Sequence, residues 1–598
     1  MAESSERSGL GLMIVVTWCC LAVLLILKAA TAPGGLVLST DDAMRLVQVR
    51  DLLGGQSWFD TTQWRMNAPF GLPMHWSRLV DGSIAGLILL FRFVTDAKTA
   101  ETWALYVWPL LPLLPVLFAL THVAFRLAGR TGALLALALG ASCVAAMTPF
   151  KPGNIDHHNM QLALGLAFVA FLIDFDRSRW AAVVAAIIAA VSLAIGIETL
   201  PYIAAGVLAL AVWWIAGGQI SGAVTRFGVT LSVTSTVLLM GATAMPYRFS
   251  VACDTFSGYY AALLVASGVG MAALPKLAVL NTPFRKSVAV IGIGVALVLL
   301  TGLVAPACLH GPYSAVDPRL YPIWMSGVAE DQSPFLLGRM APGNFIGGYF
   351  YCVLAALASV AAVFLVEPDK RRIMLIVCVF ALAGLAIASL EMRGLSFALL
   401  FATPGLIVVV TRVLGRLALP KSASVIATFA AVLLTSNASY AFVGEQIQKS
   451  LPVKQQFDAV QTNWTQACNA PKAYRELAAL PAGRVVSFID QGSMILAYTH
   501  HATLAGPYHR NSAGILDTYA VFAGSAAEQR AVLKQRRIDY VILCSPAPDY
   551  AEWGAIARPD SLLKRDAKGF GESWLEAIVA KPKLGAIRIY RVRQDRLG

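Results

Sequence analysis

Long runs of apolar residues alternate with short polar connections over the first three quarters of the chain. A helix needs about 20 apolar residues to cross the hydrocarbon core of a membrane, so each run of that length predicts one spanning helix. Thirteen runs qualify, and they lie at 9–30, 101–127, 131–149, 157–174, 179–196, 199–216, 226–245, 257–279, 287–306, 343–366, 373–390, 394–413 and 421–441. A further apolar stretch, Ile84 to Val94, is too short to span and contains Arg92, which predicts an amphipathic helix at the membrane interface.

Every second connection between these runs carries positive charge, which places these connections on one side of the membrane. If the N-terminus is cytoplasmic, the connections after runs two, four, six, eight, ten and twelve face the cytoplasm, where Lys and Arg accumulate. All six contain them, as Arg126 and Arg130, Arg177 and Arg179, Arg226, Arg285 and Lys286, Lys370 to Arg372, and Arg412, Arg416 and Lys421. Counting 84–94 as a span would reverse every later connection. The pattern predicts a multi-pass protein of the inner (cytoplasmic) membrane with a cytoplasmic N-terminus and a periplasmic or extracellular C-terminus.

The first run has an alternative interpretation as a signal peptide. Ala30-Thr31-Ala32 resembles a cleavage site, although the apolar region before it is long for a signal peptide.

The chain changes character near residue 442. Runs of β-branched and aromatic residues at Val485 to Ile489, Tyr540 to Cys544 and Ile587 to Val592 have strand length, and 511–537 has helical spacing. We therefore expect a transmembrane domain over 1–441, with outer loops 31–100 and 307–342, and a soluble α/β domain over 442–598. Cys468 could pair with Cys544, and Cys253 with Cys308, in an oxidising compartment; buried free thiols are the alternative.

Composition agrees with this outline. The 598 residues are 57% hydrophobic and 14% charged, with a mean hydropathy of +0.66, which excludes an ordinary soluble enzyme and a disordered chain. Nine cysteines are too few for a disulfide scaffold. The net charge of +13 is of the kind that cytoplasmic loops and lipid headgroups account for, so we expect membrane lipid and no nucleic acid as partner.

Polar chemistry collects on the predicted outer face. Seven of the eight histidines lie there, and only His122 lies near the inner side. Pumps and ion-coupled carriers place ionisable residues in the middle of spans, where this sequence has few.

Three acidic sites share that face. Asp42 follows Asp41 at the start of a predicted helix, Asp156 and His158 lie two residues apart in a turn, and Glu330 lies in a long loop. Each has a plain alternative role, as a helix N-cap or a solvated side chain. Together, carboxylates and an imidazole suit a hard divalent cation, Mn²⁺ or Mg²⁺, which would neutralise a lipid-linked phosphate as leaving group.

Three cations occupy short outer turns, against the general trend. Lys151, Arg248 and Arg393 are therefore candidates for binding an anionic phosphate, and a local pair with Glu391 is the alternative for Arg393.

The order and sidedness of these residues resemble the catalytic subunit of oligosaccharyltransferase, a member of the GT-C class of membrane glycosyltransferases, and in particular its archaeal-type members. The family has thirteen spans and an outer C-terminal domain. The segments that carry the resemblance are Asp41-Asp42, Trp58-Phe59-Asp60, Asn67-Ala68-Pro69-Phe70-Gly71-Leu72-Pro73-Met74-His75-Trp76, Asp156-His157-His158, Gly327-Val328-Ala329-Glu330, Arg393 and Phe488-Ile489-Asp490-Gln491-Gly492.

The resemblance implies a polytopic α-helical fold of GT-C type with a soluble α/β domain, and it implies roles for individual residues. Asp42, Asp156 and Glu330 would be catalytic, and the metal would be bound by Asp42, Asp156 and His158, with Asp41 as the alternative to Asp42. Arg393, with Lys151 and Arg248, would hold the donor phosphate. Asp490, Gln491, Gly492 and His509 would lie on the acceptor side; a surface turn is the alternative for His509. The reaction would be a single displacement at the anomeric carbon.

The sequence departs from the family at the acceptor motif. Phe488 and Ile489 replace two tryptophans, Gln491 replaces a tyrosine, and Gly327 replaces a threonine. The acceptor is therefore open between a glycan, a lipid and a protein asparagine. The resulting hypothesis is a glycosyltransferase that uses a polyprenyl-phosphate or polyprenyl-pyrophosphate sugar donor on the outer face. The alternatives are a transporter or lipid flippase of the cell-envelope glycan pathway and a non-catalytic scaffold.

Overall fold

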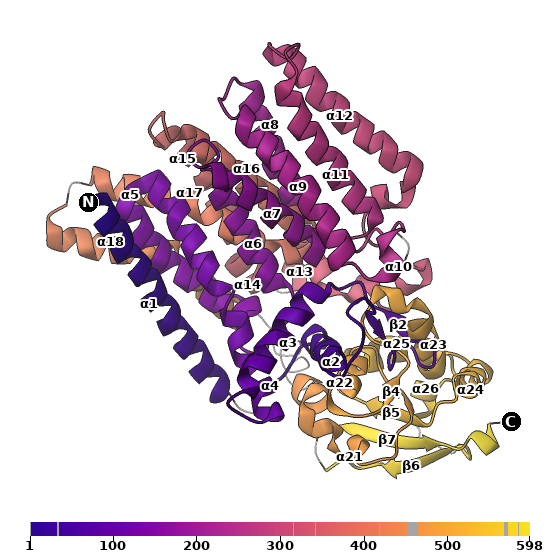
Figure 1. Ribbon diagram of the computed structural model, residues 1–598. Helices are drawn as coiled ribbons and strands as arrows, with labels where there is room; N and C mark the ends of the chain where they lie inside the picture. The colour runs from indigo at the N-terminus through magenta and orange to yellow at the C-terminus, as the bar shows by residue number, and fades with distance from the viewer. Residues whose placement is uncertain are drawn as a thin grey trace.

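The computed structural model describes residues 2–32, 35–314, 316–340, 342–417, 419–450, 464–566, 572–583 and 585–597. A body of long helices carries a smaller α/β domain at one end, where the C-terminus lies (Figure 1).

The helical part contains both long and short helices. The helices are α1 (Ala2–Ala30), α2 (Thr40–Leu53), α3 (Arg78–Arg92), α4 (Ala97–Val107), α5 (Leu113–Ala146), α6 (His158–Leu172), α7 (Arg179–Ile195), α8 (Leu200–Ile215), α9 (Ser221–Gly241), α10 (Met245–Arg248), α11 (Gly258–Ala273), α12 (Pro283–Val304), α13 (Pro334–Met340), α14 (Pro342–Asn344), α15 (Tyr351–Leu365), α16 (Arg371–Leu390), α17 (Leu395–Arg416), α18 (Lys421–Thr435) and α19 (Asn437–Ser450). The short helical turns are η1 (Trp108–Leu110), η2 (Thr148–Phe150), η3 (Ile197–Thr199), η4 (Leu274–Lys276), η5 (Pro306–His310), η6 (Pro318–Leu320), η7 (Met325–Gly327), η8 (Ala329–Asp331), η9 (Phe345–Phe350) and η10 (Met392–Gly394).

The predicted apolar runs all coincide with helical segments. Among the described residues, nine helices are long and apolar enough to cross a membrane, and α18 with α19, bent by 52°, would make a tenth. The difference from thirteen has two sources. Helices α6 and α7 are apolar but shorter than a full span, and the runs at 101–127 and 131–149 form one helical stretch, Ala97–Ala146. That stretch is broken at Gly129, whose φ of 64° is open to glycine without strain.

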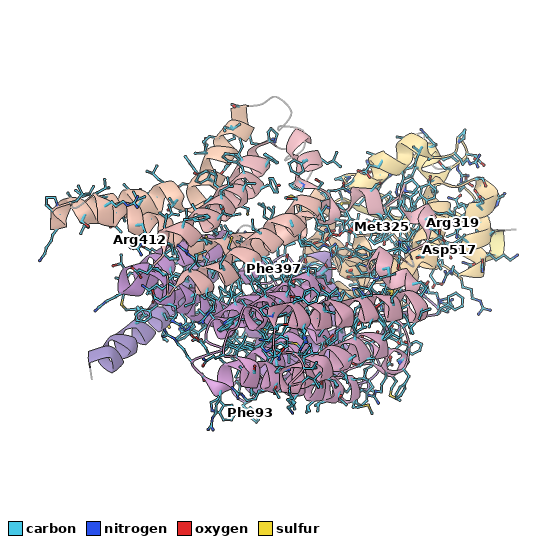
Figure 2. All side chains as sticks on the ribbon, turned by 90° about the horizontal axis from the view of Figure 1, so that it is seen from above. Phe93, Arg319, Met325, Phe397, Arg412 and Asp517 are labelled. Carbon is cyan, nitrogen blue, oxygen red and sulfur yellow. A yellow bond between two sulfur atoms is a disulfide. The ribbon has the colours of Figure 1, made fainter. Side chains whose placement is uncertain are left out.

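The connections predicted to share the inner face contact one another. Arg372 pairs with Asp176 at 2.7 Å, Arg412 pairs with Glu367 at 2.8 Å, and Arg126 pairs with Asp174. Arg412 lies at the end of the helical body away from the C-terminal domain, whereas Arg319 and Met325 lie at the opposite end, beside Asp517 of that domain (Figure 2).

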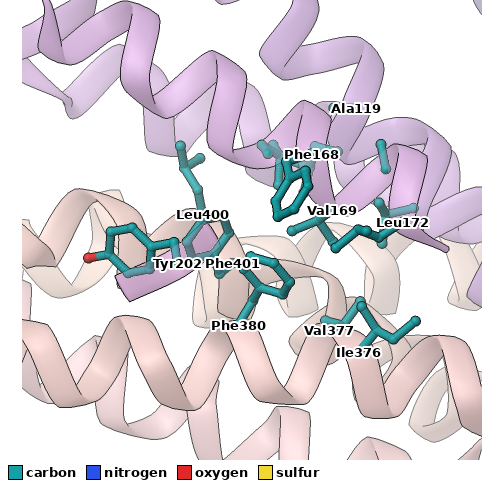
Figure 3. Close-up of a cluster of buried hydrophobic side chains, with 14 of the residues drawn as sticks. Ala119, Phe168, Val169, Leu172, Tyr202, Ile376, Val377, Phe380, Leu400 and Phe401 are labelled. Atoms are coloured by element: carbon teal, nitrogen blue, oxygen red, sulfur yellow. The ribbon is translucent and has the colours of Figure 1, made fainter. Parts of the chain in front are cut away.

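Small residues and aromatic rings hold the helices together. A Cβ on Gly268 of α11 would lie 2.5 Å from the Gly228 carbonyl oxygen of α9, so only glycine permits this approach. Phe168, Phe380 and Phe401 fill the centre of the bundle, and Tyr202 packs against Phe401 at a ring distance of 5.3 Å (Figure 3). Close backbone contacts at glycine and interlocking aromatic side chains together give the helical body a tightly packed core.

The C-terminal domain is built on a five-stranded sheet with the order β4-β3-β5-β7-β6. β3 is parallel to both β4 and β5, and β7 is antiparallel to β5 and β6. The strands are β3 (Arg484–Val486), β4 (Ala502–Thr503), β5 (Tyr540–Cys544), β6 (Leu575–Val579) and β7 (Ile587–Val592). The helices and turns are η11 (Thr465–Asn469), η12 (Pro471–Tyr474), α21 (Arg475–Ala478), α22 (Gln491–Tyr498), η13 (His509–Asn511), α23 (Ser512–Ala523), α24 (Ala526–Gln535), α25 (Pro548–Ile556), α26 (Leu562–Asp566) and η14 (Gln594–Arg596).

Two details of the domain differ from the sequence-based expectation. The first predicted strand ends at Val486, because Phe488 and Ile489 turn into the core instead. The predicted helix at 511–537 is two helices, since Ser525 caps a new one, α24. The other two predicted strands are confirmed.

The first outer loop and the C-terminal domain share one core. β1 (Thr62–Gln63) and β2 (Leu72–Pro73) form a small antiparallel ladder in that loop. Arg65 donates to the carbonyl oxygens of Leu496 and Thr499, and the Ala68 amide donates to the Thr503 oxygen at 3.1 Å. The domain is thereby held against α2, at one end of the helical body (Figure 1). Two disulfides, Cys253–Cys308 and Cys468–Cys544, are present. Of the two alternatives for these four cysteines, pairing is therefore the one that the structure has.

Candidate active site

A polar cavity of about 80 Å³ lies where α2, the helical body and the C-terminal domain meet. Its lining includes Asp41, His158, Glu198, Glu330, Arg393 and His509. These residues are spread over more than 450 positions and come from six separate segments, so the cavity is a product of the tertiary fold.

Asp42 does not line this cavity, contrary to our expectation. Its Oδ2 accepts hydrogen bonds from the Ser39 hydroxyl at 2.6 Å and the Ser39 amide at 3.3 Å. Its Oδ1 accepts from the amides of Ile155 and Asp156 at 2.7 and 3.0 Å. Burial raises the pKa of Asp42 to about 6, and these hydrogen bonds oppose the rise. The Asp42 carboxylate closes a capping box and fastens the 155–156 turn to α2.

Asp41, the neighbour on α2, faces the cavity instead. Burial raises the pKa of Asp41 well above its ordinary value, and the nearby carboxylates of Asp156, Glu330 and Asp42 add to the rise. Several carboxylates therefore crowd one buried place, which is the environment that a bound cation relieves.

The turn before α6 supplies the second group of ligands. One oxygen of Asp156 accepts from Arg45 at 3.1 Å and lies 2.6 Å from His157 Nδ1, and its other oxygen lies 3.4 Å from His158 Nε2. Burial alone would raise the pKa of Asp156, but the charges of His157 and Arg45 hold it well below its usual range. Asp156 in turn raises the pKa of His157 to about 10. Ligand atoms of Asp156, His157 and His158 lie within 4.8 Å of one another, so this group could hold a metal ion.

Arg45 of α2 holds this turn in position through its hydrogen bond to Asp156. Its guanidinium is fully buried, donates to Asp81 at 2.9 Å and lies 4.3 Å from the Trp76 ring centre. A buried guanidinium with two carboxylate partners and an aromatic face holds its partners in one geometry.

Glu330 and Arg393 meet at another wall of the cavity, as the sequence suggested. Arg393 Nη2 lies 3.7 Å from a Glu330 carboxylate oxygen and contacts Asp331. Arg393 Nε lies 3.4 Å from a Glu391 carboxylate oxygen. Its Nη1 donates to the Tyr313 hydroxyl at 2.9 Å. The local pair with Glu391 is therefore real, and Arg393 lines the cavity as well. Half of the Glu330 side chain, 52%, is exposed.

Two of the predicted phosphate ligands do not line the cavity. Arg248 donates from Nη2 to the Met240 and Thr243 carbonyl oxygens and stacks on Phe59, so it caps the end of α9. Lys151 lies in the turn before α6, where burial and the nearby Lys28 lower its pKa.

The predicted acceptor motif is also turned away from the cavity. Gln491 is fully buried, and a Cβ on Gly492 would lie 1.8 Å from the Ala505 carbonyl oxygen, so both residues pack inside the domain. Asp490 precedes α22, where burial and Glu552 raise its pKa to about 6. Of the four predicted acceptor residues, only His509 lines the cavity. These positions face the core because α22 packs them between α2 and the sheet.

Sequence reasoning missed Glu198, Tyr313 and His75, which also line the cavity. Glu198 accepts from Gln161 at 2.9 Å and lies 3.9 Å from His157 Nε2. One signal pointed to it: a lone carboxylate between two long apolar runs, where an unpaired charge is costly.

The polar cavity adjoins an apolar one of about 220 Å³. His158, Glu198, Tyr313 and Arg393 line both, and the second continues between helices along Leu200, Tyr202 and Phe397. A ligand with a charged head and an apolar tail matches this pair of cavities.

No protein-family model and no curated protein sequence match the chain. Its fold, however, matches solved structures. The oligosaccharyltransferase of Archaeoglobus fulgidus in its apo form has a TM-score of 0.63 at 14% identity, covering 94% of this chain and 73% of that one. The archaeal oligosaccharyltransferase AglB from Archaeoglobus fulgidus, in complex with an inhibitory peptide and a dolichol-phosphate, gives a TM-score of 0.62 at 15% identity, with 94% of this chain and 72% of that one covered. The Archaeoglobus fulgidus oligosaccharyltransferase in complex with Zn and sulfate gives 0.60 at 13%, with 97% and 72% covered.

The protein therefore has the fold of the GT-C membrane glycosyltransferases. Its fold is similar to that of the archaeal oligosaccharyltransferase over 94% of the chain. The resemblance carried by the motifs is thereby confirmed at the level of the fold.

Proposed function

We propose that the protein is a membrane glycosyltransferase that moves a sugar or oligosaccharide from a polyprenyl-phosphate or polyprenyl-pyrophosphate donor to an acceptor on the outer membrane face. One observation carries the proposal. Asp41, His158, Glu330 and Arg393, from four distant parts of the chain, meet in one cavity that adjoins an apolar cavity between helices. Asp156 lies behind this lining, with one oxygen 3.4 Å from His158 Nε2. A lipid-linked phosphate has both the charge and the apolar tail that this arrangement fits.

Asp41, Asp156 and His158 are the residues that would hold a divalent cation, Mn²⁺ or Mg²⁺. The donor set fits because Asp156 and His158 have ligand atoms within 4.8 Å of each other. It also fits because burial, together with the nearby Asp156 carboxylate, raises the pKa of Asp41, which a bound cation would relieve. A bound cation would act as a Lewis acid toward the departing phosphate. One structure of the archaeal enzyme, which shares this fold, holds Zn and sulfate. The Asp42 carboxylate is already occupied by hydrogen bonds from the amides of Ile155 and Asp156. Asp41 therefore takes the role of metal ligand that the sequence analysis gave to Asp42.

Arg393 and Tyr313 lie where the polar cavity meets the apolar one, and this is where a lipid-linked phosphate would sit. Arg393 provides charge to the phosphate, and its contacts with Asp331 and Glu391 keep it in position. Glu330, half exposed and 3.7 Å from Arg393 at the same wall of the cavity, would orient an incoming acceptor. The archaeal enzyme has been solved with a dolichol-phosphate, which is consistent with this kind of donor.

The sidedness that we propose is a cytoplasmic N-terminus and an outer catalytic face in the inner membrane. Both disulfides join segments assigned to the outer side, whereas the free cysteines lie in the helices, at Cys19, Cys20, Cys143, Cys352 and Cys378. This is the distribution expected when only the outer segments meet an oxidising compartment.

The test uses purified protein in lipid nanodiscs with polyprenyl-linked sugars extracted from membranes. We expect Mn²⁺- or Mg²⁺-dependent release of polyprenyl phosphate or pyrophosphate, lost in His158→Gln and Asp156→Asn. Asp317→Asn is the matched control, because Asp317 is an outer-loop carboxylate outside the cavity that pairs with Arg319. Metal-independent movement of intact donor across the bilayer, with no cleavage, would instead support the flippase alternative.

A further inference from the structure

A histidine and an aspartate pair across the boundary between the C-terminal domain and the helical body. His509, the first residue of η13, places Nε2 2.6 Å from Oδ2 of Asp254, which lies in the connection between α10 and α11. Each side chain is only 12% exposed. The two residues are 255 positions apart, and His509 lines the polar cavity.

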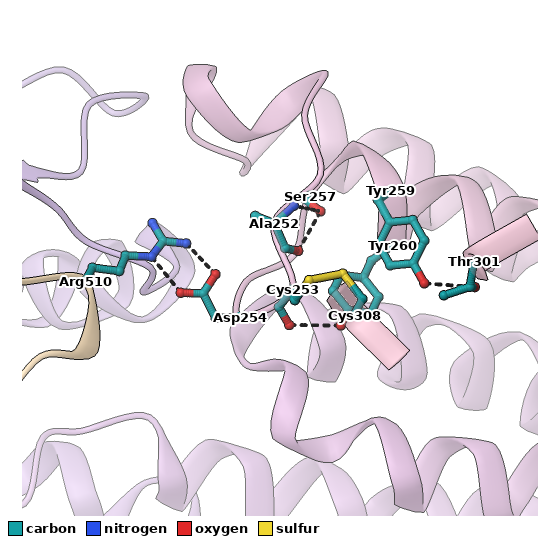
Figure 4. The surroundings of a disulfide bond; sticks show 9 residues. All are labelled: Ala252, Cys253, Asp254, Ser257, Tyr259, Tyr260, Thr301, Cys308 and Arg510. Carbon is teal, nitrogen blue, oxygen red and sulfur yellow. Dashed lines mark hydrogen bonds and ion pairs between the residues drawn. A yellow bond between two sulfur atoms is a disulfide. The ribbon is translucent and has the colours of Figure 1, made fainter. Parts of the chain in front are cut away.

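Besides His509, Asp254 is held in place by the side chain of Arg510 and by the disulfide of the preceding residue (Figure 4). Arg510 donates to both of its oxygens, from Nε at 2.6 Å and from Nη2 at 2.7 Å, and Arg510 itself contacts the Tyr247 hydroxyl. The adjacent Cys253 forms a disulfide with Cys308 of η5. The hydrogen bonds and charges of Arg510 and His509 hold the pKa of Asp254 well below its usual range, so this carboxylate stays ionised.

The ionised carboxylate determines where the proton of the histidine lies. A carboxylate accepts hydrogen bonds and donates none, so Nε2 of His509 must carry the hydrogen. In the neutral ring, the lone pair is then on Nδ1. The other titratable or charged groups around the ring are His75 at a ring distance of 4.7 Å, Tyr313 at 5.1 Å and Arg510. Burial, with the charge of Arg510, lowers the pKa of His75 well below its ordinary value and keeps it neutral.

His75, Asp254 and His509 have ligand atoms within 4.8 Å of one another, which also describes a metal site. The contacts of Arg510 argue against it. The guanidinium already neutralises Asp254 through both oxygens, so a divalent cation would meet two neutral imidazoles and no net negative charge. An oriented histidine fits these contacts better than a cation does.

Tyr313 lies between this histidine and the proposed phosphate site. Its ring packs edge-on against His509, and its hydroxyl accepts a hydrogen bond from Arg393. The arginine that would hold the departing phosphate and His509 are thus separated by one aromatic side chain, on two sides of one cavity. A displacement reaction places the leaving group and the incoming nucleophile on opposite sides of the reacting carbon.

We propose that His509, oriented by Asp254, is the general base of the transfer and that the acceptor is a hydroxyl group, as on a glycan, rather than an asparagine amide. This inference rests on the proposed function. The acceptor oxygen forms a bond to the anomeric carbon while the bond from that carbon to the phosphate oxygen breaks. The electron pair of that bond leaves with the phosphate, and the hydroxyl proton passes to Nδ1 of His509. Removing a hydroxyl proton as the bond forms is the usual work of an imidazole base.

A second observation favours a hydroxyl acceptor. In this fold the loop that would grip an acceptor peptide is turned inward, with Phe488 stacked on Phe522 at 4.7 Å and Gln491 fully buried. The residues that reach the cavity from the C-terminal domain are instead Pro507, Tyr508 and His509.

The experiment compares His509→Ala, Asp254→Asn and the control His500→Ala in nanodiscs with the extracted lipid-linked sugars. His500 is an exposed histidine of the same domain that bonds to the Leu480 oxygen. The acceptors are octyl glycosides, which offer hydroxyl groups, and an Asn-x-Thr peptide, with products identified by mass spectrometry. We expect transfer to octyl glycosides, reduced ~10²–10⁴-fold in His509→Ala and unchanged in His500→Ala.

Three readouts separate a base from a structural residue. Added imidazole should restore part of the His509→Ala activity, the acidic limb of the pH profile should vanish in that variant, and Mn²⁺-dependent donor binding should stay as in wild type. Asp254→Asn should lower the rate and shift the pH profile. Transfer to the peptide alone, or full activity of His509→Ala, overturns the inference and leaves the proposed function standing. If wild-type protein cleaves no lipid-linked sugar, the proposed function fails and this inference with it.

Discussion

Two adjacent carboxylates, Asp41 and Asp42, face different surroundings in this protein. Asp41 lines the polar cavity, whereas Asp42 closes the capping box of α2. Consecutive residues on a helix point about 100° apart, so only one of them can face the cavity. The sequence contained the relevant signal, because Ser39 and Asp42 have the spacing of a capping box. The resemblance to a metal motif pointed to Asp42, and the local capping rule would have pointed to Asp41 as the residue left free for chemistry. Arg248 is a similar case, since an arginine in an outer turn also suits the carbonyl oxygens at a helix end.

We predict that Asp42→Ala destabilises the protein and that Asp41→Asn does not. Asp42→Ala removes four hydrogen bonds and leaves two buried amides unpaired, at a cost of about 1–3 kcal/mol in the free energy of unfolding. Asp41→Asn should abolish metal-dependent donor binding with the fold intact. Thermal unfolding in detergent and Mn²⁺ binding measure the two effects. Equal loss of stability in both variants would contradict the separation of roles.

The stability of the metal-free protein should decrease with rising pH through Asp41. Its pKa is raised in the folded state, so the folded protein binds this proton more tightly than the unfolded chain does. The contribution is fully present below the ordinary pKa of Asp and is lost as pH rises toward the raised value. Asp41→Asn should remove this component, and saturating Mn²⁺ should offset it. Melting temperatures of wild type and Asp41→Asn from about pH 4 to 8 test this, and parallel curves would disprove it.

Whole segments position the site through close backbone contacts and covalent ties. The helices α9 and α11 approach at glycine, and the connection after α10 is tied to η5 by a disulfide. Apolar runs predicted nearly all helices, because run length is a local property of consecutive residues. They overcounted full spans, since α6 and α7 are shorter than the membrane is thick and gain their stability from neighbouring helices.

Gly268→Ala should destabilise the contact between α9 and α11. The added Cβ would lie 2.5 Å from a backbone oxygen that cannot move aside, and we expect a cost of about 1–3 kcal/mol. Gly292→Ala is the control, because no atom lies within 4 Å of a Cβ at that position of α12. Unfolding in detergent with increasing denaturant compares the two, and equal midpoints would count against the contact.

Loss of the Cys253–Cys308 disulfide should slow the transfer without releasing the fold. The double variant Cys253→Ser/Cys308→Ser leaves Asp254 held by the side chains of Arg510 and His509 without the covalent tie, so we expect a rate about 10-fold lower and unchanged donor binding. The control is Cys19→Ser/Cys20→Ser, which changes two exposed thiols of α1. A double variant with wild-type kinetics would show that the tie is not needed to position Asp254.

The polar cavity lies between the helical part, including its first outer loop, and the C-terminal domain, which are far apart in the sequence. The C-terminal domain docks on the first outer loop, and Tyr508 even donates to the Thr40 oxygen at the start of α2, at 3.3 Å. The predicted boundary at 441/442 falls inside α19, which continues to Ser450.

Arg65→Ala should loosen this docking. Arg65 donates to the carbonyl oxygens of Leu496, Thr499 and His501, which belong to the C-terminal domain. We expect faster proteolytic release of the domain and weaker acceptor binding, with donor binding and membrane insertion retained. Arg530→Ala, an exposed arginine on α24, is the control. Unchanged proteolysis in Arg65→Ala would mean that other contacts are sufficient.

The amino-acid sequence alone determined the helical membrane architecture, the presence of a C-terminal α/β domain and several of the candidate residues that line the polar cavity, such as His158, Glu330 and Arg393. These features depend on the length of apolar runs and on the distribution of charge, which neighbouring residues set. The choice of Asp41 over Asp42, the burial of Gln491 and Gly492 and the pairing of Asp254 with His509 came from the folded chain. They depend on how each helix is rotated and on which distant segments pack together, and no local pattern encodes either.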